Sequence, residues 1–174
     1  MAAGEFQLQV VSPEEKLLET PATAVVLRSS DGELTILDGH TDLITDVVPT
    51  QVRVDQQEGE AIRLAVHGGF LQVETGELDG GGEVGEAKGS DRSTRVTLLA
   101  GIAERAEDID VARAEQAKSA AESRIEELRA SGTARAEGGD DTPLTPEDVE
   151  LASAESALAR AELRISVGSG AATA

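Results

Sequence analysis

The chain has 174 residues, 39% of them hydrophobic, which is enough for one domain, or for one modest domain with an appendage. Its 34 acidic residues against 15 Lys and Arg give a formal net charge of −19, and a field this negative disfavours binding to nucleic acid or to anionic lipid. Cysteine is absent, which excludes disulfides, thiolate metal sites and thiol nucleophiles. The first eleven residues lack the basic and apolar regions of a signal peptide, and no apolar run approaches the ~20 residues of a membrane span.

Short aliphatic and β-branched runs alternate with turn residues up to residue 100. Phe6, Leu8 and Val10 share one face of a strand at period two, and Ile62, Leu64 and Val66 repeat the pattern. The predicted strands cover 6–10, 24–28, 33–37, 43–48, 52–54, 62–66, 69–74 and 95–100. Short strands at spacings of about ten residues are typical of an antiparallel sandwich or barrel.

From residue 101 the pattern becomes helical and rich in alanine, which predicts a helical hairpin over residues 101–174. The first helix is predicted at about 104–130, a stretch without Gly or Pro. Its shared face carries Ala114, Ala117, Ala121, Ile125 and Leu128. The second is predicted at 146–167, because Thr145 can cap it and Pro146 suits its first position. Its seam for packing on another helix carries Leu151, Ala154, Leu158, Ala161 and Ile165.

Two glycine-rich or charged segments, 79–93 and 131–144, are interpreted as mobile surface loops. Gly80, Gly82 and Gly85 match the dinucleotide pattern G-x-G-x-x-G. That pattern binds pyrophosphate only between a strand and a helix. Because Gly and Ser follow it here, we interpret it as part of a flexible loop.

No residue set predicts catalysis or a metal site. His40 and His67 are the only histidines, neither has a companion at metal-ligand spacing, and both are interpreted as structural residues. The nucleophile elbow G-x-S-x-G is absent, and no carboxylate pair stands out as an acid and a base.

Two groups of charged residues on the helices remain open to two interpretations. Asp110 and Arg113, three residues apart, fit either an ordinary helix start or a ligand site. Arg160 and Arg164 project from the same face of the second helix and fit a phosphate grip. They could equally pair with Glu162 or with acids on the partner helix.

Several short segments, in this order and spacing, resemble the epsilon subunit family of F-type ATP synthases over residues 5–130 and, more weakly, 147–167. They are Val11-Ser12-Pro13-Glu14, Gly32-Glu33-Leu34-Thr35-Ile36-Leu37, Gly39-His40, Gly68-Gly69-Phe70-Leu71 with Val73, and the run 103–114. Asp38 and Asp42 stand where that family usually has proline.

The resemblance implies an N-terminal antiparallel β-sandwich, residues 1–100, followed by a two-helix antiparallel hairpin. It implies a non-catalytic rotor subunit that helps couple proton flow to ATP synthesis. The expected partners are the gamma subunit and the c-ring, with Gly39 and His40 in a docking loop. The alpha and beta subunits become partners when the hairpin extends and regulates hydrolysis. The chain would then lie at the cytoplasmic face of the bacterial cell membrane, touching the membrane only through the complex.

The resemblance also implies that ATP is a possible regulatory ligand, with no cofactor required. Its nucleotide-binding members carry the pattern I/L-D-x-x-R-A. The matching residues here are Ile109, Asp110, Arg113 and Ala114, together with Glu104, Arg160 and Arg164. The alternative is a free-standing nucleotide sensor or scaffold with a sandwich and a helical arm.

Overall fold

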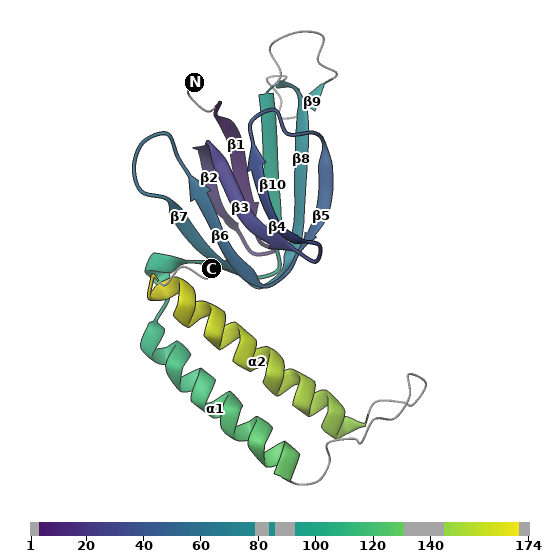
Figure 1. Cartoon of the computed structure of the whole chain (residues 1–174), viewed down its shortest axis with the longest axis vertical. Helices are drawn as coiled ribbons and strands as arrows, with labels where there is room; N and C mark the ends of the chain where they lie inside the picture. Colours follow the sequence, from purple (N-terminus) through teal and green to yellow (C-terminus); the bar gives the residue numbers. More distant parts are fainter. Residues whose placement is uncertain (1–3, 79–83, 86–92, 131–144, 171–174) are drawn as a thin grey trace. The chain divides into compact units, whose positions relative to one another are not determined.

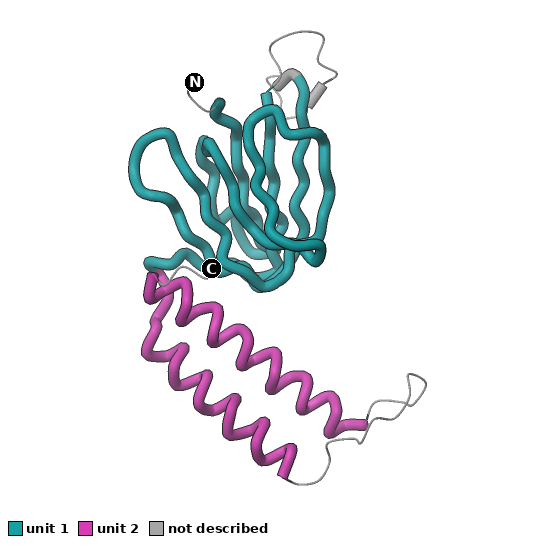
Figure 2. Tube along the Cα trace, viewed as in Figure 1, with its two compact units in different colours: residues 1–107 teal, residues 108–174 magenta. Residues whose placement is uncertain are grey.

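The computed structural model describes residues 4–78, 84–85, 93–130 and 145–170. These residues form two compact units, residues 1–107 and 108–174, which are described separately (Figure 2). The segments interpreted above as loops, 79–93 and 131–144, fall almost entirely outside the described residues.

The first unit is a sandwich of two β-sheets (Figure 1). One sheet contains, in spatial order, β2 (Lys16–Ala22), β1 (Phe6–Val11), β10 (Ser93–Ala100), β8 (Gly69–Leu78) and β5 (Leu43–Val47), and the two-residue β9 (Val84–Gly85) pairs with β8. The other contains β11 (Ala103–Arg105), β7 (Ile62–Val66), β6 (Thr50–Asp55), β3 (Ala24–Ser29) and β4 (Gly32–Leu37). The sandwich prediction is therefore confirmed.

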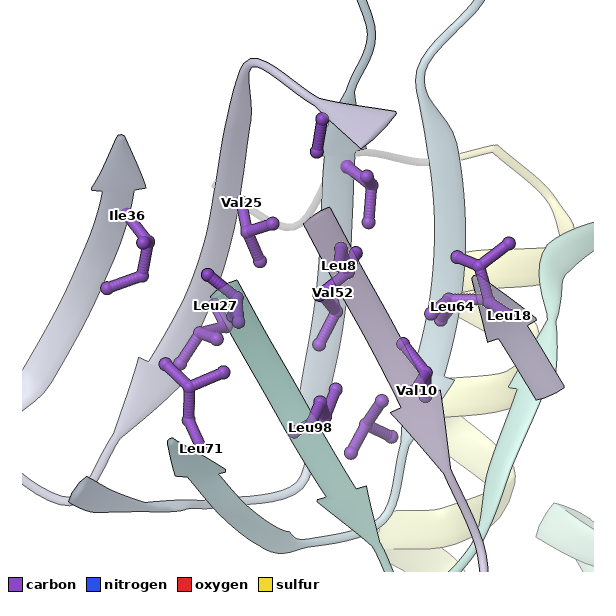
Figure 3. Packing of buried hydrophobic residues seen from close by; sticks show 14 of the residues in the cluster. Leu8, Val10, Leu18, Val25, Leu27, Ile36, Val52, Leu64, Leu71 and Leu98 are labelled. Atoms are coloured by element: carbon purple, nitrogen blue, oxygen red, sulfur yellow. The ribbon is translucent and has the colours of Figure 1, made fainter. Parts of the chain in front are cut away.

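The core lies between the two sheets, where strands from both contribute alternate side chains (Figure 3). Leu8 and Leu98 enter it from the first sheet, and Val25 and Leu64 from the second. These side chains are fully buried. The period-two positions of the sequence are thus the inward positions of the strands.

The sandwich differs from the prediction in three respects. β1 and β10 pair in parallel, which needs no tight turn because the two strands lie at opposite ends of the sandwich sequence. β2 was not predicted, since only two of its residues are buried and Pro21 interrupts its pattern. Proline is tolerated there because β2 is an edge strand.

The third difference corrects the predicted start of the first helix at 104. Residues 103–105 instead form β11, which pairs with β7, and a 3-10 turn follows at 106–108. The helix α1 is Val111–Ala130. Pairing with β7 satisfies the backbone N–H and C=O groups of residues 103–105, which a longer helix would have bonded within itself. The sheet and the first unit therefore extend beyond the predicted boundary at residue 100.

The second unit is a hairpin of α1 and α2 (Pro146–Gly168), which lie side by side and antiparallel (Figure 1). The predicted cap of α2 is confirmed. The Thr145 hydroxyl accepts from the Asp148 backbone N–H at 3.2 Å, and the Asp148 carboxylate accepts from the Thr145 N–H at 2.8 Å. Such a reciprocal capping box satisfies two donors that a helix start leaves free. Among the described helices, none is long and apolar enough to span a membrane.

Candidate functional site

Asp110 fixes the start of α1. Its carboxylate Oδ1 accepts from the Arg113 backbone N–H at 3.0 Å, and its carbonyl accepts from the Ala114 N–H at 3.0 Å. This is the geometry of a helix N-cap, which stabilises a helix by about 1 kcal/mol. Asp110 therefore has a structural role as the N-cap of α1. By fixing where the helix begins, it also fixes the direction in which the side chains of the first turn project.

Close packing with the end of α2 holds the beginning of α1. A β-carbon on Gly168 would lie 2.8 Å from Val111 Cγ2 and 3.0 Å from Ile109 Cγ2. Only glycine allows this approach. Ile109 is half-buried and Ala114 is buried, so the matched apolar residues of the motif serve the packing of the hairpin.

Arg113 and Arg160 lie on the same side of the hairpin. Each directly precedes a buried seam alanine, Ala114 or Ala161, and so points about 100° away from the seam at 3.6 residues per turn. The two helices are antiparallel, and rotation by the same angle on each leads to the same side of the pair. Arg164 lies one turn beyond Arg160 and shares its face. We call Arg113, Arg160 and Arg164 the arginine face.

The arginines of this face differ in their contacts, and Arg164 has an interaction of its own. Among the described residues, no hydrogen bond or ion pair holds the exposed Arg113 guanidinium. The Arg160 guanidinium donates to the Ser156 hydroxyl at 2.6 Å. Arg160 and Arg164 are both half-buried. The face thus presents guanidinium groups that suit an anion with several oxygens.

Glu162 pairs with Lys118 and not with Arg160, so one of the pairings considered for Arg160 in the sequence does not form. Its carboxylate Oε1 lies 3.1 Å from Lys118 Nζ on α1, on the other side of the seam. Residues two apart on a helix do not face each other. Glu162 is two residues from both Arg160 and Arg164, so its side chain projects away from both arginines. Hydrogen bonding to Glu162 raises the pKa of Lys118 above its usual value.

Glu104, the remaining residue of the motif match, belongs to the first unit. It lies in β11 in register with Ala65 of β7 and is half-buried. The hairpin therefore brings together the predicted residues of α1 and α2, whereas Glu104 belongs to the sandwich.

The loop with Gly39 and His40 is fixed by side-chain contacts. The Gly39 N–H donates to the hydroxyl of buried Thr94 at 2.8 Å, and the Thr75 hydroxyl donates to the His40 carbonyl at 2.7 Å. Asp42 Oδ1 accepts from the Thr75 N–H at 2.8 Å. Asp42, which replaces a family proline, thus anchors the loop by accepting a hydrogen bond. Gly39 has a φ of +76°, a conformation that favours glycine.

The sequence interpretation missed a row of apolar residues on the outer face of the first sheet. Leu99 of β10 is in register with Phe70 of β8 on one side and with Val11 of β1 on the other. Phe70 is 60% exposed and Leu99 is 48% exposed. We call Val11, Leu99 and Phe70 the apolar row. Phe70 directly precedes the inward-facing Leu71, so period-two alternation could have identified it as an outward residue.

A groove of about 540 Å³ lies beside the apolar row, and all three residues of the row line it. Its lining consists of Val11, Ser12, Pro13, His67, Gly68, Gly69, Phe70, Leu99, Ala100 and Gly101. Most of this lining is apolar or glycine, so the groove suits an apolar side chain of another protein. Across the part of the chain that the structure describes, no three His, Asp or Glu residues are grouped so that they could hold a metal ion.

Comparison with known proteins identifies the family. The beta-sandwich domain of the ATP synthase delta/epsilon chain matches residues 5–79, and the long alpha-helix domain of that chain matches residues 107–168. The ATP synthase epsilon chain of Desulforudis audaxviator is 38% identical over 125 residues, which are 72% of this chain and 77% of that protein. The epsilon chain of Pelotomaculum thermopropionicum is 37% identical over 119 residues, 68% of this chain and 75% of that protein.

A solved structure agrees with this assignment at the level of the fold. A chain of the mitochondrial ATP synthase of Euglena gracilis superposes with a TM-score of 0.61 at 19% identity, over 91% of this chain and 78% of that one. The predicted resemblance is confirmed, and a free-standing sensor or scaffold is not favoured. The chain belongs to the ATP synthase delta/epsilon chain family and has the role of an epsilon-type rotor subunit.

Proposed function

We propose that the sandwich docks this subunit on the gamma subunit and the c-ring, and that the chain contributes no catalytic group of its own. In this role it helps to couple proton flow to ATP synthesis, at the cytoplasmic face of the bacterial cell membrane and in contact with the membrane only through the complex. The observation that carries the proposal is the apolar row beside its groove.

The size and exposure of the apolar row make it a docking surface. Fully burying a Phe or Leu side chain stabilises a complex by about 1.5–3 kcal/mol relative to leaving it in water. Phe70 and Leu99 are neighbours on adjacent strands, so one partner surface can cover both at once. Aromatic residues in such positions often dominate the energy of an interface.

The test is co-purification of the gamma subunit with the full chain. Replacing Phe70 by Ser is expected to weaken the complex at least tenfold, because the largest side chain of the row is lost. Leu37→Ser is the matched control, since Leu37 is 51% exposed but lies in β4 of the other sheet. Equal binding by the two variants would show that the apolar row is not the docking surface.

The arginine face carries a second proposal, that the hairpin binds ATP as a regulatory ligand. Arg113 on α1 and Arg160 and Arg164 on α2 lie on one side only when the helices are side by side. An anion bound by all three therefore favours the closed hairpin, because it binds one state better than the other. The chain's net charge of −19 opposes this binding, and local guanidinium groups offset it.

Titration calorimetry of the full chain with ATP tests this proposal. The Arg113→Ala variant is expected to bind at least tenfold more weakly, since a charge-assisted hydrogen bond contributes about 1.5–3 kcal/mol. Arg28→Ala is the control, because exposed Arg28 lies on the sandwich strand β3. Absence of heat and of a thermal shift at millimolar ATP would end the ATP proposal and leave the rotor proposal intact.

A further inference from the structure

The Lys118–Glu162 ion pair crosses the seam of the hairpin at the level of the arginine face. Glu162 lies between Arg160 and Arg164 in the sequence of α2 and projects from the opposite side. Lys118 also lies 3.8 Å from Glu122 on its own helix, so the cross-helix contact of 3.1 Å is the closer of its two ion pairs. The pair thus joins the two helices on the side of the seam opposite to the arginines.

Apolar packing at the very end of the hairpin comes from buried Val167 and from Gly168, which lies against Ile109 and Val111. Nearer the Lys118–Glu162 pair, the buried seam residues include the small alanines Ala114 and Ala161, which bury little apolar area. The apolar cluster of the hairpin lies toward the other end and consists of Ile125, Leu128 and Ala154 with the half-buried Leu151 and Leu158. A polar contact between the helices therefore adds to the small apolar burial at the level of the Lys118–Glu162 pair.

The Lys118–Glu162 contact also fixes the register of the arginine face. When α1 lies beside α2, Arg113 and Arg164 are offset by about three residues, or ~4.5 Å along the helix axes, as the Lys118–Glu162 register requires. The two arginines therefore lie at nearly the same level along the hairpin. The Lys118–Glu162 ion pair lies on the other side of the seam, close to this level.

We propose that Lys118 and Glu162 are positioning residues, which hold α1 beside α2 so that Arg113 reaches the anion bound by Arg160 and Arg164. This inference rests on the proposed binding of ATP. Lys118 and Glu162 themselves do not contact the nucleotide. The anion affinity of the arginine face therefore depends on an acidic residue of the opposite face.

The variant Glu162→Gln separates positioning from simple electrostatics. Removing a negative charge near an anion site would by itself tighten ATP binding. Loss of the positioning contact would weaken it. Lys118→Arg is the conservative variant that keeps the pair. Arg129→Gln is the matched control, because Arg129 makes the same kind of cross-helix pair with Glu155, at 3.1 Å, near the other end of the hairpin.

Calorimetric titration with ATP, on the full chain, gives the first measurement. Glu162→Gln is expected to raise the ATP dissociation constant about threefold, as expected for an exposed ion pair. Lys118→Arg and Arg129→Gln are expected to stay within twofold of the unaltered chain. Unchanged or tighter binding by Glu162→Gln would overturn the proposal. Equally weakened ATP binding by Arg129→Gln would also overturn the proposal. The loss of affinity would then come from destabilising the hairpin as a whole.

A distance measurement without ATP gives the second. The chain has no cysteine, so Ala120→Cys and Ala159→Cys provide unique spin-label sites on exposed positions of α1 and α2. Glu162→Gln is expected to broaden the interhelix distance distribution, and Arg129→Gln to leave it narrow at these labels. An unchanged distribution in Glu162→Gln would overturn the positioning role. If the unaltered chain binds no ATP, the ATP proposal fails and this distance alone decides whether the pair positions the helices.

Discussion

The backbone of Gly69 packs directly against the carbonyl oxygen of Leu99. A β-carbon on Gly69 would lie 2.1 Å from that oxygen and 3.0 Å from the α-carbon of Ala100. The contact lies where β8 begins beside β10, in the strand pair that carries Phe70 and Leu99. The absence of a side chain at residue 69 therefore allows the apolar row to form.

Gly69→Ala is expected to destabilise the sandwich by about 2 kcal/mol or more, because backbone atoms must move to admit the methyl group. Denaturant unfolding of the full chain measures this effect. Gly101→Ala is the matched control, since the nearest atom to its β-carbon would be 3.9 Å away. Similar midpoints for the two variants would contradict the close contact.

Thr94→Val is expected to destabilise the fold by about 1–2 kcal/mol, because the Gly39 N–H loses the hydroxyl that accepts its hydrogen bond. The amide of Gly39 should also exchange with solvent faster, which hydrogen exchange measures. Thr97→Val, on the same strand but half-buried, is the control. Unchanged exchange at Gly39 would show that Thr94 does not hold the loop.

Hydrogen bonds from Lys16, at 2.7 Å, and from Gln9, at 2.9 Å, lower the pKa of Glu19 below its usual value. A lowered pKa in the folded state stabilises the fold above the unfolded pKa of about 4.3, and that contribution is lost as the pH falls through the folded pKa. Carboxyl NMR titration should show the pKa of Glu19 rising in Lys16→Met but not in Lys16→Arg. A pKa that is the same in all three proteins would contradict this account.

Much of the fold could be predicted from local patterns. Alternation identified the inward residues of strands such as β7 and β10, and Thr145 and Pro146 marked the start of α2. These signals are local because side-chain periodicity and capping depend on near neighbours.

The residues that sequence reasoning missed depend on distant neighbours. Residues 103–105 form a strand only because the edge of β7 is available to them, and no periodicity of their own reveals that partner. Similarly, Lys118 and Glu162 meet through the packing of two helices that are far apart in the sequence. The arginine face was partly predictable, since the i, i+4 spacing places Arg160 and Arg164 together, but its relation to Arg113 required the hairpin register.

A chain truncated after Glu107 is expected to fold on its own, with a β-type circular dichroism spectrum and a cooperative melt. A chain truncated after Ala100 lacks β11 and exposes the edge of β7, so its melting temperature should be lower by several degrees, as expected for a loss of about 1 kcal/mol in a domain of this size. Equal melting temperatures would show that β11 contributes nothing to the first unit.

Docking on the rotor by the sandwich rather than by the hairpin can be tested by the affinity of the chain truncated after Glu107 for the isolated gamma subunit. That truncated chain keeps the apolar row and its groove but lacks α1 and α2. Its dissociation constant is expected within about threefold of that of the full chain, because lost contacts worth about 1.4 kcal/mol would change it about tenfold. Loss of binding by a truncated chain that still melts cooperatively would contradict the account and assign the docking energy to the hairpin.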